Sequence, residues 1–139
     1  MTPEQVRLVQ ESFAKVAPIS DKAAELFYDR LFETAPHLRA MFPDDMRTQR
    51  AKLMATLATV VNGLHDLDTI LPAASALAKR HVGYGAQPWH YPPVGEALLW
   101  TLEKGLGEAW TAPVAGAWSQ AYATLSRFMI SEAYGQKVA

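Results

Sequence analysis

The chain has 139 residues, half of them hydrophobic and four of them tryptophan, which suffices for one ordinary domain with a substantial core. A formal net charge of −1 without a basic cluster excludes a typical nucleic-acid-binding surface. The absence of cysteine excludes disulfides, iron–sulfur clusters, thiolate catalysis and thiolate metal ligation.

The N-terminal segment predicts a helix start and not a targeting sequence. Thr2 suits the N-cap position, Pro3 the first helical position, and Gln5 completes a capping box. The segment lacks the charged region, apolar core and cleavage site of a signal peptide, and no apolar run approaches the roughly 20 residues that cross a bilayer. We therefore expect residues 1–139 to form a single cytoplasmic domain without membrane insertion.

The hydrophobic pattern is helical along the chain, and no stretch shows the two-residue alternation of a half-buried strand. This pattern predicts an all-α fold. Helices are expected from Pro3 to Pro18, from Ser20 as N-cap towards Pro36, as a short turn before Phe42, and at about 46–64, 69–83, 91–106 and 112–134. Gly83 and Gly85 are expected to mark the exit of the fourth long helix.

His81 is the strongest candidate metal ligand among the four histidines. It lies one turn after Leu77 on the apolar face of its predicted helix, although such a histidine is more often a core or surface residue. The other three, His37, His65 and His90, form no pair with the i, i+3 or i, i+4 spacing of a two-histidine zinc helix, so a zinc site is not expected. Neutral imidazole is a common ligand of haem iron.

Several coincident spacings resemble the globin family over nearly the whole chain. Globins have a pocket-facing residue in helix B, a proline eight residues later in helix C, and a phenylalanine six residues further on that stacks on the haem; here these are Tyr28, Pro36 and Phe42. The distal residue of helix E and the apolar residue one turn later match Gln49 and Leu53. The proximal ligand of helix F matches His81. The segments 80–85, 90–92 and 94–95 are similar to bacterial single-domain globins and flavohaemoglobin haem domains, with some likeness to neuroglobin-type proteins.

The resemblance implies a 3-over-3 globin sandwich around haem b (iron protoporphyrin IX), with a short or absent D helix and His81 as the iron ligand. The residues that it places around the haem are Phe42, Gln49, Lys52, Leu53, Leu77, Arg80, His81, Tyr91 and Val94. Lys52 and Arg80 would pair with the propionates, and a solvated surface charge is the alternative reading of both.

The resemblance also implies a ferrous iron that binds dioxygen and other diatomic gases such as CO and NO. We expect Tyr28 to be the main hydrogen-bond donor to bound dioxygen, and Gln49 to be a second donor or to position the phenol. Such bonds contribute roughly 1.5–3 kcal/mol, which predicts slow release and high oxygen affinity. The alternatives are a packing role for Tyr28 and a solvent-facing Gln49.

On the proximal side, flavohaemoglobin-like globins strengthen the imidazole through a tyrosine and a glutamate. Tyr91 matches the tyrosine, but the glutamate position falls on Ala133, and Glu132 lies one residue earlier. One residue on a helix is a rotation of about 100°. The sequence therefore leaves open whether Glu132 completes a network with Tyr91 and His81 and so produces a strong electron-donating effect on the imidazole.

Three classes of function remain from the sequence. The first is reversible oxygen binding for transport, storage or sensing. The second is nitric oxide detoxification by a dioxygenase that uses a separate reductase, since the chain has no flavin or nicotinamide motif. The third is a helical bundle without a cofactor. A monomer or weak homodimer is expected in each case.

Overall fold

The structure, a computed structural model, describes residues 1–83 and 88–133 of the chain. Within these ranges it has six α-helices and no strand, which confirms the all-α prediction. The α-helices are α1 (Pro3–Val16), α2 (Ser20–Thr34), α3 (Arg47–Gly63), α4 (Leu67–Gly83), α5 (Tyr91–Leu106) and α6 (Ala112–Ala133). The 3₁₀ helices are η1 (Ala17–Ile19), η2 (Pro36–Met41), η3 (Pro88–His90) and η4 (Gly107–Ala109).

The two predicted N-caps have different outcomes. The hydroxyl of Thr2 accepts a bond of 3.1 Å from the Gln5 N–H, and the Gln5 side chain accepts one of 3.0 Å from the Thr2 N–H, which confirms the capping box. Ser20 as an N-cap is wrong, because Ser20 is already the first helical residue of α2 and the cap residue Ile19 makes no side-chain bond. The reason is η1, which leads into α2 without the extended residue that a capping side chain needs.

The remaining boundaries agree closely with expectation. The segment 42–46 between η2 and α3 contains no helix, as expected for a short or absent D helix. The helix α4 begins at Leu67, two residues before the expected start, and Pro72 lies inside both the expected and the observed helix. Gly85 and the expected last residue of α6, Tyr134, lie outside the described residues.

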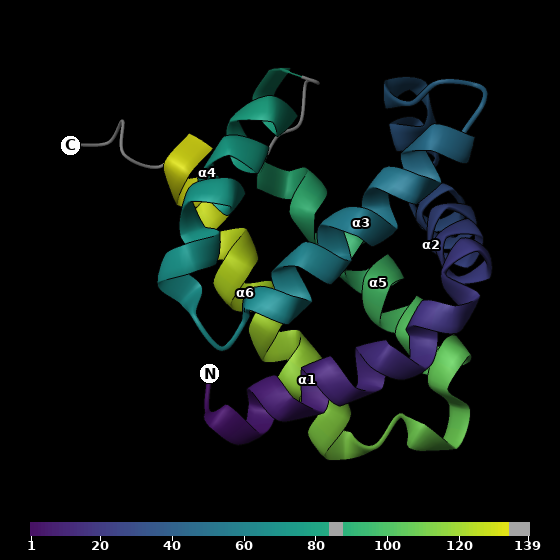
Figure 1. Cartoon of the computed structure of the whole chain (residues 1–139). Coiled ribbons are helices and arrows are strands. Elements are labelled where there is room, and N and C mark those ends of the chain that lie inside the picture. Colours follow the sequence, from purple (N-terminus) through teal and green to yellow (C-terminus); the bar gives the residue numbers. More distant parts are fainter. Residues whose placement is uncertain (84–87, 134–139) are drawn as a thin grey trace.

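The core is formed where α1, α2, α5 and α6 meet. The helix α2 packs mainly on α5, whereas α6 contacts both α1 and α4, and α1 crosses α6 at the bottom of Figure 1. Val9, Val16 and Leu31 are the largest side chains that are almost fully buried. The buried indole of Trp118 donates a 2.8 Å bond to the hydroxyl of Ser12, which satisfies both polar groups and joins α6 to α1.

The helices α3 and α4 diverge from their connecting turn, as Figure 1 shows. At the turn the two helices approach each other closely. A Cβ atom added to Gly63 would lie only 2.1 Å from the Cγ2 atom of Ile70, so the approach requires glycine at this position. Further along, α4 packs mainly on α6 and only slightly on α3. The first half of α3 and the last half of α4 therefore lie at the open end of this pair. None of the helices within the described ranges has the length and hydropathy needed to span a membrane.

Candidate functional site

Tyr28 occupies the inner face of α2, where its phenol is 6% exposed. Its ring packs edge-on against Phe27 and Phe42 at centroid distances of 4.8 and 5.6 Å, and it stacks on Phe32 at 5.9 Å. Phe42, the first residue after η2, reaches this aromatic cluster because η2 folds back against α2. The three phenylalanine rings hold the phenol ring of Tyr28 in place. Two of the residues predicted from the sequence, Tyr28 and Phe42, are therefore in contact.

Gln49, in the first turn of α3, is bonded to Tyr28 across the α2–α3 contact. Its amide nitrogen donates a hydrogen bond of 3.1 Å to the Tyr28 hydroxyl oxygen. A phenol oxygen that accepts such a bond keeps its own hydrogen for another acceptor. Burial raises the pKa of the Tyr28 hydroxyl, an effect that the bond from Gln49 partly offsets. The group therefore remains a neutral donor at physiological pH.

The remainder of α3 carries an apolar surface that is only partly covered. Within this 17-residue helix only Val61 is buried, whereas the apolar side chains of Leu53, Leu57 and Val60 are half-buried. Leu53 also borders a small internal cavity of about 10 Å³ beside Phe27. Such a half-covered apolar face is what a flat apolar cofactor requires from a helix.

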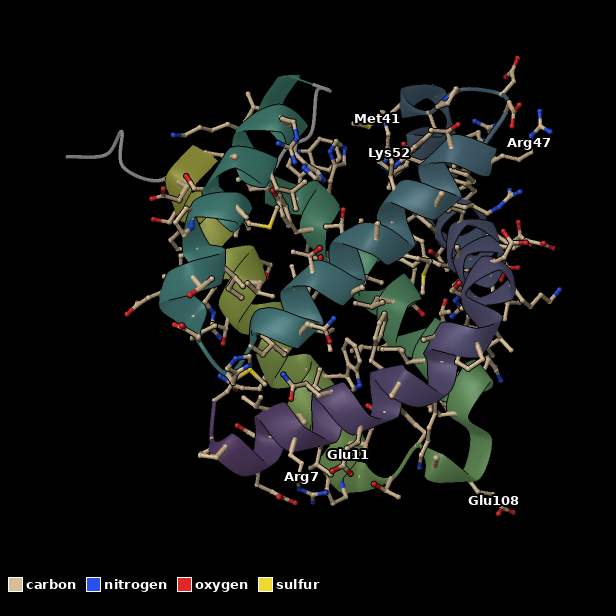
Figure 2. All side chains as sticks on the ribbon, viewed as in Figure 1. Arg7, Glu11, Met41, Arg47, Lys52 and Glu108 are labelled. Atoms are coloured by element: carbon tan, nitrogen blue, oxygen red, sulfur yellow. The ribbon has the colours of Figure 1, made fainter. Side chains whose placement is uncertain are left out.

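Lys52 lies exposed on α3, towards the open end of the α3–α4 pair. In Figure 2 both Lys52 and Met41, at the end of η2, extend towards the side occupied by α4, whereas Arg47 points to the opposite side. Arg47 is paired with Asp45 at 2.7 Å. Lys52, a predicted haem-contacting residue, thus lies beside the open end of the α3–α4 pair, and Arg47 does not.

His81 lies in the last turn of α4 and is half-buried. Its Nδ1 atom is 2.7 Å from the carbonyl oxygen of Leu77, one turn earlier in the same helix. A carbonyl only accepts, so Nδ1 carries the hydrogen, and the lone pair of the neutral imidazole is on Nε2. This tautomer and this oriented ring are what an Nε2 metal ligand needs.

Tyr91, the first residue of α5, lies next to this histidine. Its side chain is buried, and its ring centroid is 6.5 Å from that of His81, with 33° between the ring planes. Val94, one turn later, is half-buried against the core. Arg80 is exposed on α4. The structure therefore joins His81 with Leu77 and Tyr91, and leaves Arg80 at the surface.

Glu132, on α6, bonds to a residue that the sequence analysis did not single out. Its Oε1 atom accepts a 2.7 Å bond from the hydroxyl of Ser75, on α4. This bond joins α4 to α6 at an exposed position, about two turns before His81. A serine within an apolar helix was the available signal, but its partner is 57 residues away in the sequence.

The other three histidines lie outside the pair of facing helices. His37 and His90 have ring centroids 6.3 Å apart, and the ring of Trp89, which is 61% exposed, lies 4.0 Å from that of His90 with 58° between the ring planes. His65 lines a surface cleft of about 600 Å³ between α1 and the α3–α4 turn. Within the described ranges, no three histidine, aspartate or glutamate side chains are placed to hold a metal together.

The arrangement of the helices matches solved bacterial globins. A globin of Campylobacter jejuni superposes with a TM-score of 0.83 at 21% identity, with 99% of this chain and 98% of that chain covered. An engineered carbene transferase from Rhodothermus marinus superposes with a TM-score of 0.86 at 24% identity, with coverage of 99% and 95%. These likenesses define the fold as a globin fold.

Sequence comparison takes the assignment one step further. The model of the Globin family matches residues 25–129, and the chain belongs to this family. The flavohemoprotein of Rhodopirellula baltica is 29% identical over 133 residues, which cover 94% of this chain and 33% of that protein. The flavohemoprotein of Chromobacterium violaceum is 35% identical over 108 residues, covering 75% and 26%. The chain thus spans about a third or less of the length of these relatives.

Proposed function

We propose that this chain binds haem b and uses it to hold dioxygen, or another diatomic gas such as carbon monoxide or nitric oxide, with high oxygen affinity. When bound, the haem supplies a ferrous iron with one position for a protein ligand and one for the gas. Membership of the globin family and the flavohemoprotein relatives support the cofactor. The hydrogen bond between Gln49 and Tyr28 is the main observation that supports a high oxygen affinity.

The residues present fit this cofactor. His81 presents the Nε2 lone pair, because its Nδ1 hydrogen is directed to Leu77. Phe42, Leu53, Leu77, Tyr91 and Val94 would supply the apolar surround, and Lys52 and Arg80 would pair with the propionates. Both cations are exposed, so we expect their ion pairs to contribute at most about 1 kcal/mol each.

On the opposite side, Tyr28 would donate its hydroxyl hydrogen to the gas ligand. Gln49 donates to the phenol oxygen and so turns the hydroxyl hydrogen away from itself. A hydrogen bond to a ligand with negative charge contributes roughly 1.5–3 kcal/mol, or a factor of about 10 to 100 in dissociation. Bound dioxygen has such charge, and carbon monoxide has much less, so Tyr28 should favour dioxygen.

The test is an absorption spectrum of the protein with one equivalent of haem. It is recorded in the ferric state, after dithionite reduction, with carbon monoxide and, after removal of the reductant, with dioxygen. A five-coordinate ferrous spectrum that shifts with each gas supports the proposal. Six-coordinate ferrous bands would show an internal ligand and argue against gas storage, and the absence of a Soret band would reject haem binding.

A second candidate function, nitric oxide dioxygenation, is supported by the flavohemoprotein relatives, whose name joins a flavin with a haem. This reaction needs an electron to restore ferrous iron after each cycle, and a flavin reductase is the partner that would provide it. Nitric oxide consumption over many turnovers with an added reductase would favour the enzyme. A single turnover under the same conditions would favour the oxygen binder.

A further inference from the structure

Two histidines outside the proposed haem site lie side by side at the surface. They are His37, in η2, and His90, in η3, and their ring centroids are 6.3 Å apart with 36° between the ring planes. His37 is exposed and His90 is half-buried. Because the two residues belong to different short helices, their spacing along the sequence gives no sign of the pair.

The backbone of each histidine is held by a buried neighbour. Leu38, next to His37, is 3% exposed, and Tyr91, next to His90, is 9% exposed. The helix η3 also leads directly into α5, whose N-cap residue is His90. The two imidazoles are therefore carried by fixed parts of the core, which keeps them close to each other without a bond between them.

The indole ring of Trp89 lies beside both imidazoles. Its centroid is 4.0 Å from that of His90 and 6.2 Å from that of His37, and the side chain is 61% exposed. So large an exposed aromatic side chain restricts the rotation of the two imidazoles and leaves their outer side open to solvent. An ion from solution can therefore reach the pair.

The distance between the two rings suits a single metal ion. A metal–nitrogen bond of about 2.0–2.1 Å places an imidazole centroid about 3.2 Å from the ion. Two imidazoles on one ion then have centroids roughly 4.5 Å apart at a right angle and 6.4 Å apart when they lie opposite each other. The observed 6.3 Å falls within this range, at its upper end.

The charge state of the pair also suits a metal. Burial, and after it the neighbouring His37, lowers the pKa of His90 below its usual value, which favours the neutral imidazole that a metal requires. Each imidazole has two ring nitrogens, so a second contact at one of them leaves the other for an ion. Within residues 1–83 and 88–133 no carboxylate joins two such ligands to make a group of three.

We propose that His37 and His90 form a surface site for one late transition-metal ion, copper(II) in preference to zinc(II), with water in the remaining coordination positions. Imidazole suits both ions, and at a site with few ligands the higher intrinsic affinity of copper(II) decides. Calcium and magnesium require oxygen ligands, which this pair does not supply. The site does not depend on haem, and a bound ion would tie η2 to η3.

The first test measures copper(II) binding to the haem-loaded protein by equilibrium dialysis against copper chloride. We compare His37→Ala and His90→Ala with His65→Ala, an exposed histidine at the α3–α4 turn. Each of the first two variants should bind copper at least about tenfold more weakly, since loss even of a residue behind a metal ligand costs roughly 10- to 100-fold. His65→Ala should bind as the unmodified protein does, and zinc chloride should bind more weakly than copper chloride.

The second test uses the fluorescence of Trp89, which copper(II) at the pair should quench. It is carried out without haem in a His81→Ala background, because the imidazole of His81 could otherwise take copper itself. A further Trp89→Phe substitution should remove most of the quenching and leave the dialysis affinity within about twofold. This result is expected whether or not the chain binds haem, so the copper site and the haem proposal can fail separately.

Three results would overturn the proposal. They are equal copper affinity in all the histidine variants, a loss in only one of His37→Ala and His90→Ala, and quenching that survives Trp89→Phe. The copper EPR spectrum of the unmodified protein should show nitrogen splitting from imidazole, and a spectrum with oxygen ligands alone would also reject the site. If the His81→Ala background does not fold, the dialysis and EPR measurements on the haem-loaded protein decide.

Discussion

On the α2–α3 side of the site the central polar contact joins two side chains, whereas on the α4–α5 side the hydrogen bonds from His81 and Tyr122 end on backbone carbonyls. The first arrangement lets one atom be removed without moving a helix. The second attaches each side chain to a backbone carbonyl, that of Leu77 within α4 for His81 and that of Tyr91 at the start of α5 for Tyr122. We therefore expect the first side to set the affinity for the gas, and the second to set the retention and orientation of the cofactor.

The largest effect is expected on the histidine side from His81→Ala. Loss of the iron ligand should weaken haem retention by more than the roughly 10- to 100-fold that accompanies removal of a residue behind a metal ligand. The measurement is haem transfer to an acceptor protein, monitored in the Soret band. Added imidazole should restore the spectrum. His65→Ala, at the exposed α3–α4 turn, is the matched control; equal haem loss in both variants would remove His81 from its role.

On the glutamine side, Tyr28→Phe should speed dioxygen dissociation by about 10- to 100-fold, because one charge-assisted hydrogen bond is lost. Stopped-flow displacement of dioxygen by carbon monoxide measures this rate. Tyr122→Phe is the matched change on the opposite side, and its effect should be smaller. An unchanged rate in Tyr28→Phe would contradict the proposed donor.

Gln49→Leu separates the two members of the pair. The phenol then keeps its hydrogen but loses the amide that donates to its oxygen. We expect a rate between those of the unmodified protein and Tyr28→Phe. If Gln49→Leu speeds dioxygen dissociation more than Tyr28→Phe does, Gln49 and not Tyr28 is the main hydrogen-bond donor to the gas.

Alkaline pH should weaken both sides of the site. Burial raises the pKa of Tyr28 and of Tyr122 in the folded chain. Below about pH 10 both hydroxyls are protonated in the folded and the unfolded states, so this stabilisation is fully present. Above that pH the unfolded chain loses protons that the folded chain keeps, and stability falls by up to about 1.4 kcal/mol per pH unit for each tyrosine.

Urea unfolding between pH 9 and 11 measures this decline. Lysines titrate over the same range, so the informative quantity is the difference between the unmodified protein and each Tyr→Phe variant. The slope should be shallower in Tyr28→Phe and in Tyr122→Phe. Parallel slopes in all three proteins would show that neither hydroxyl is buried as described.

The smallest effect is expected at the exposed bond between Ser75 and Glu132. Ser75→Ala, Glu132→Ala and the double variant should each lower the free energy of unfolding by the same amount, less than about 1 kcal/mol, because each removes the same hydrogen bond. Ser126→Ala, whose hydroxyl bonds only within α6, is the control. The iron–histidine band should not move in Glu132→Gln; a shift would show that this carboxylate acts on His81 after all.

Much of the fold could be predicted from the sequence because the signals were local. The capping box at Thr2 and the helical hydrophobic period depend on residues within a few positions of each other, and they gave the helices to within about two residues. The prediction of Ser20 as an N-cap is wrong because η1 runs directly into α2, which gives Ser20 a helical backbone conformation, and the sequence of η1 contains no signal that indicates this. The chain has several residues of the helix-start type, and only the geometry distinguishes them.

Residue type and spacing along a helix are properties of the chain alone, and they were enough to predict the all-α class, the globin resemblance and the candidates Tyr28, Gln49 and His81. The partners of these side chains become known only when the helices are packed together. Gln49 meets Tyr28 across 21 residues, Ser75 meets Glu132 across 57, and Tyr122 meets Tyr91 across 31. Such contacts depend on how helices cross, and the crossing is set by packing over the whole core, down to the missing Cβ of Gly63.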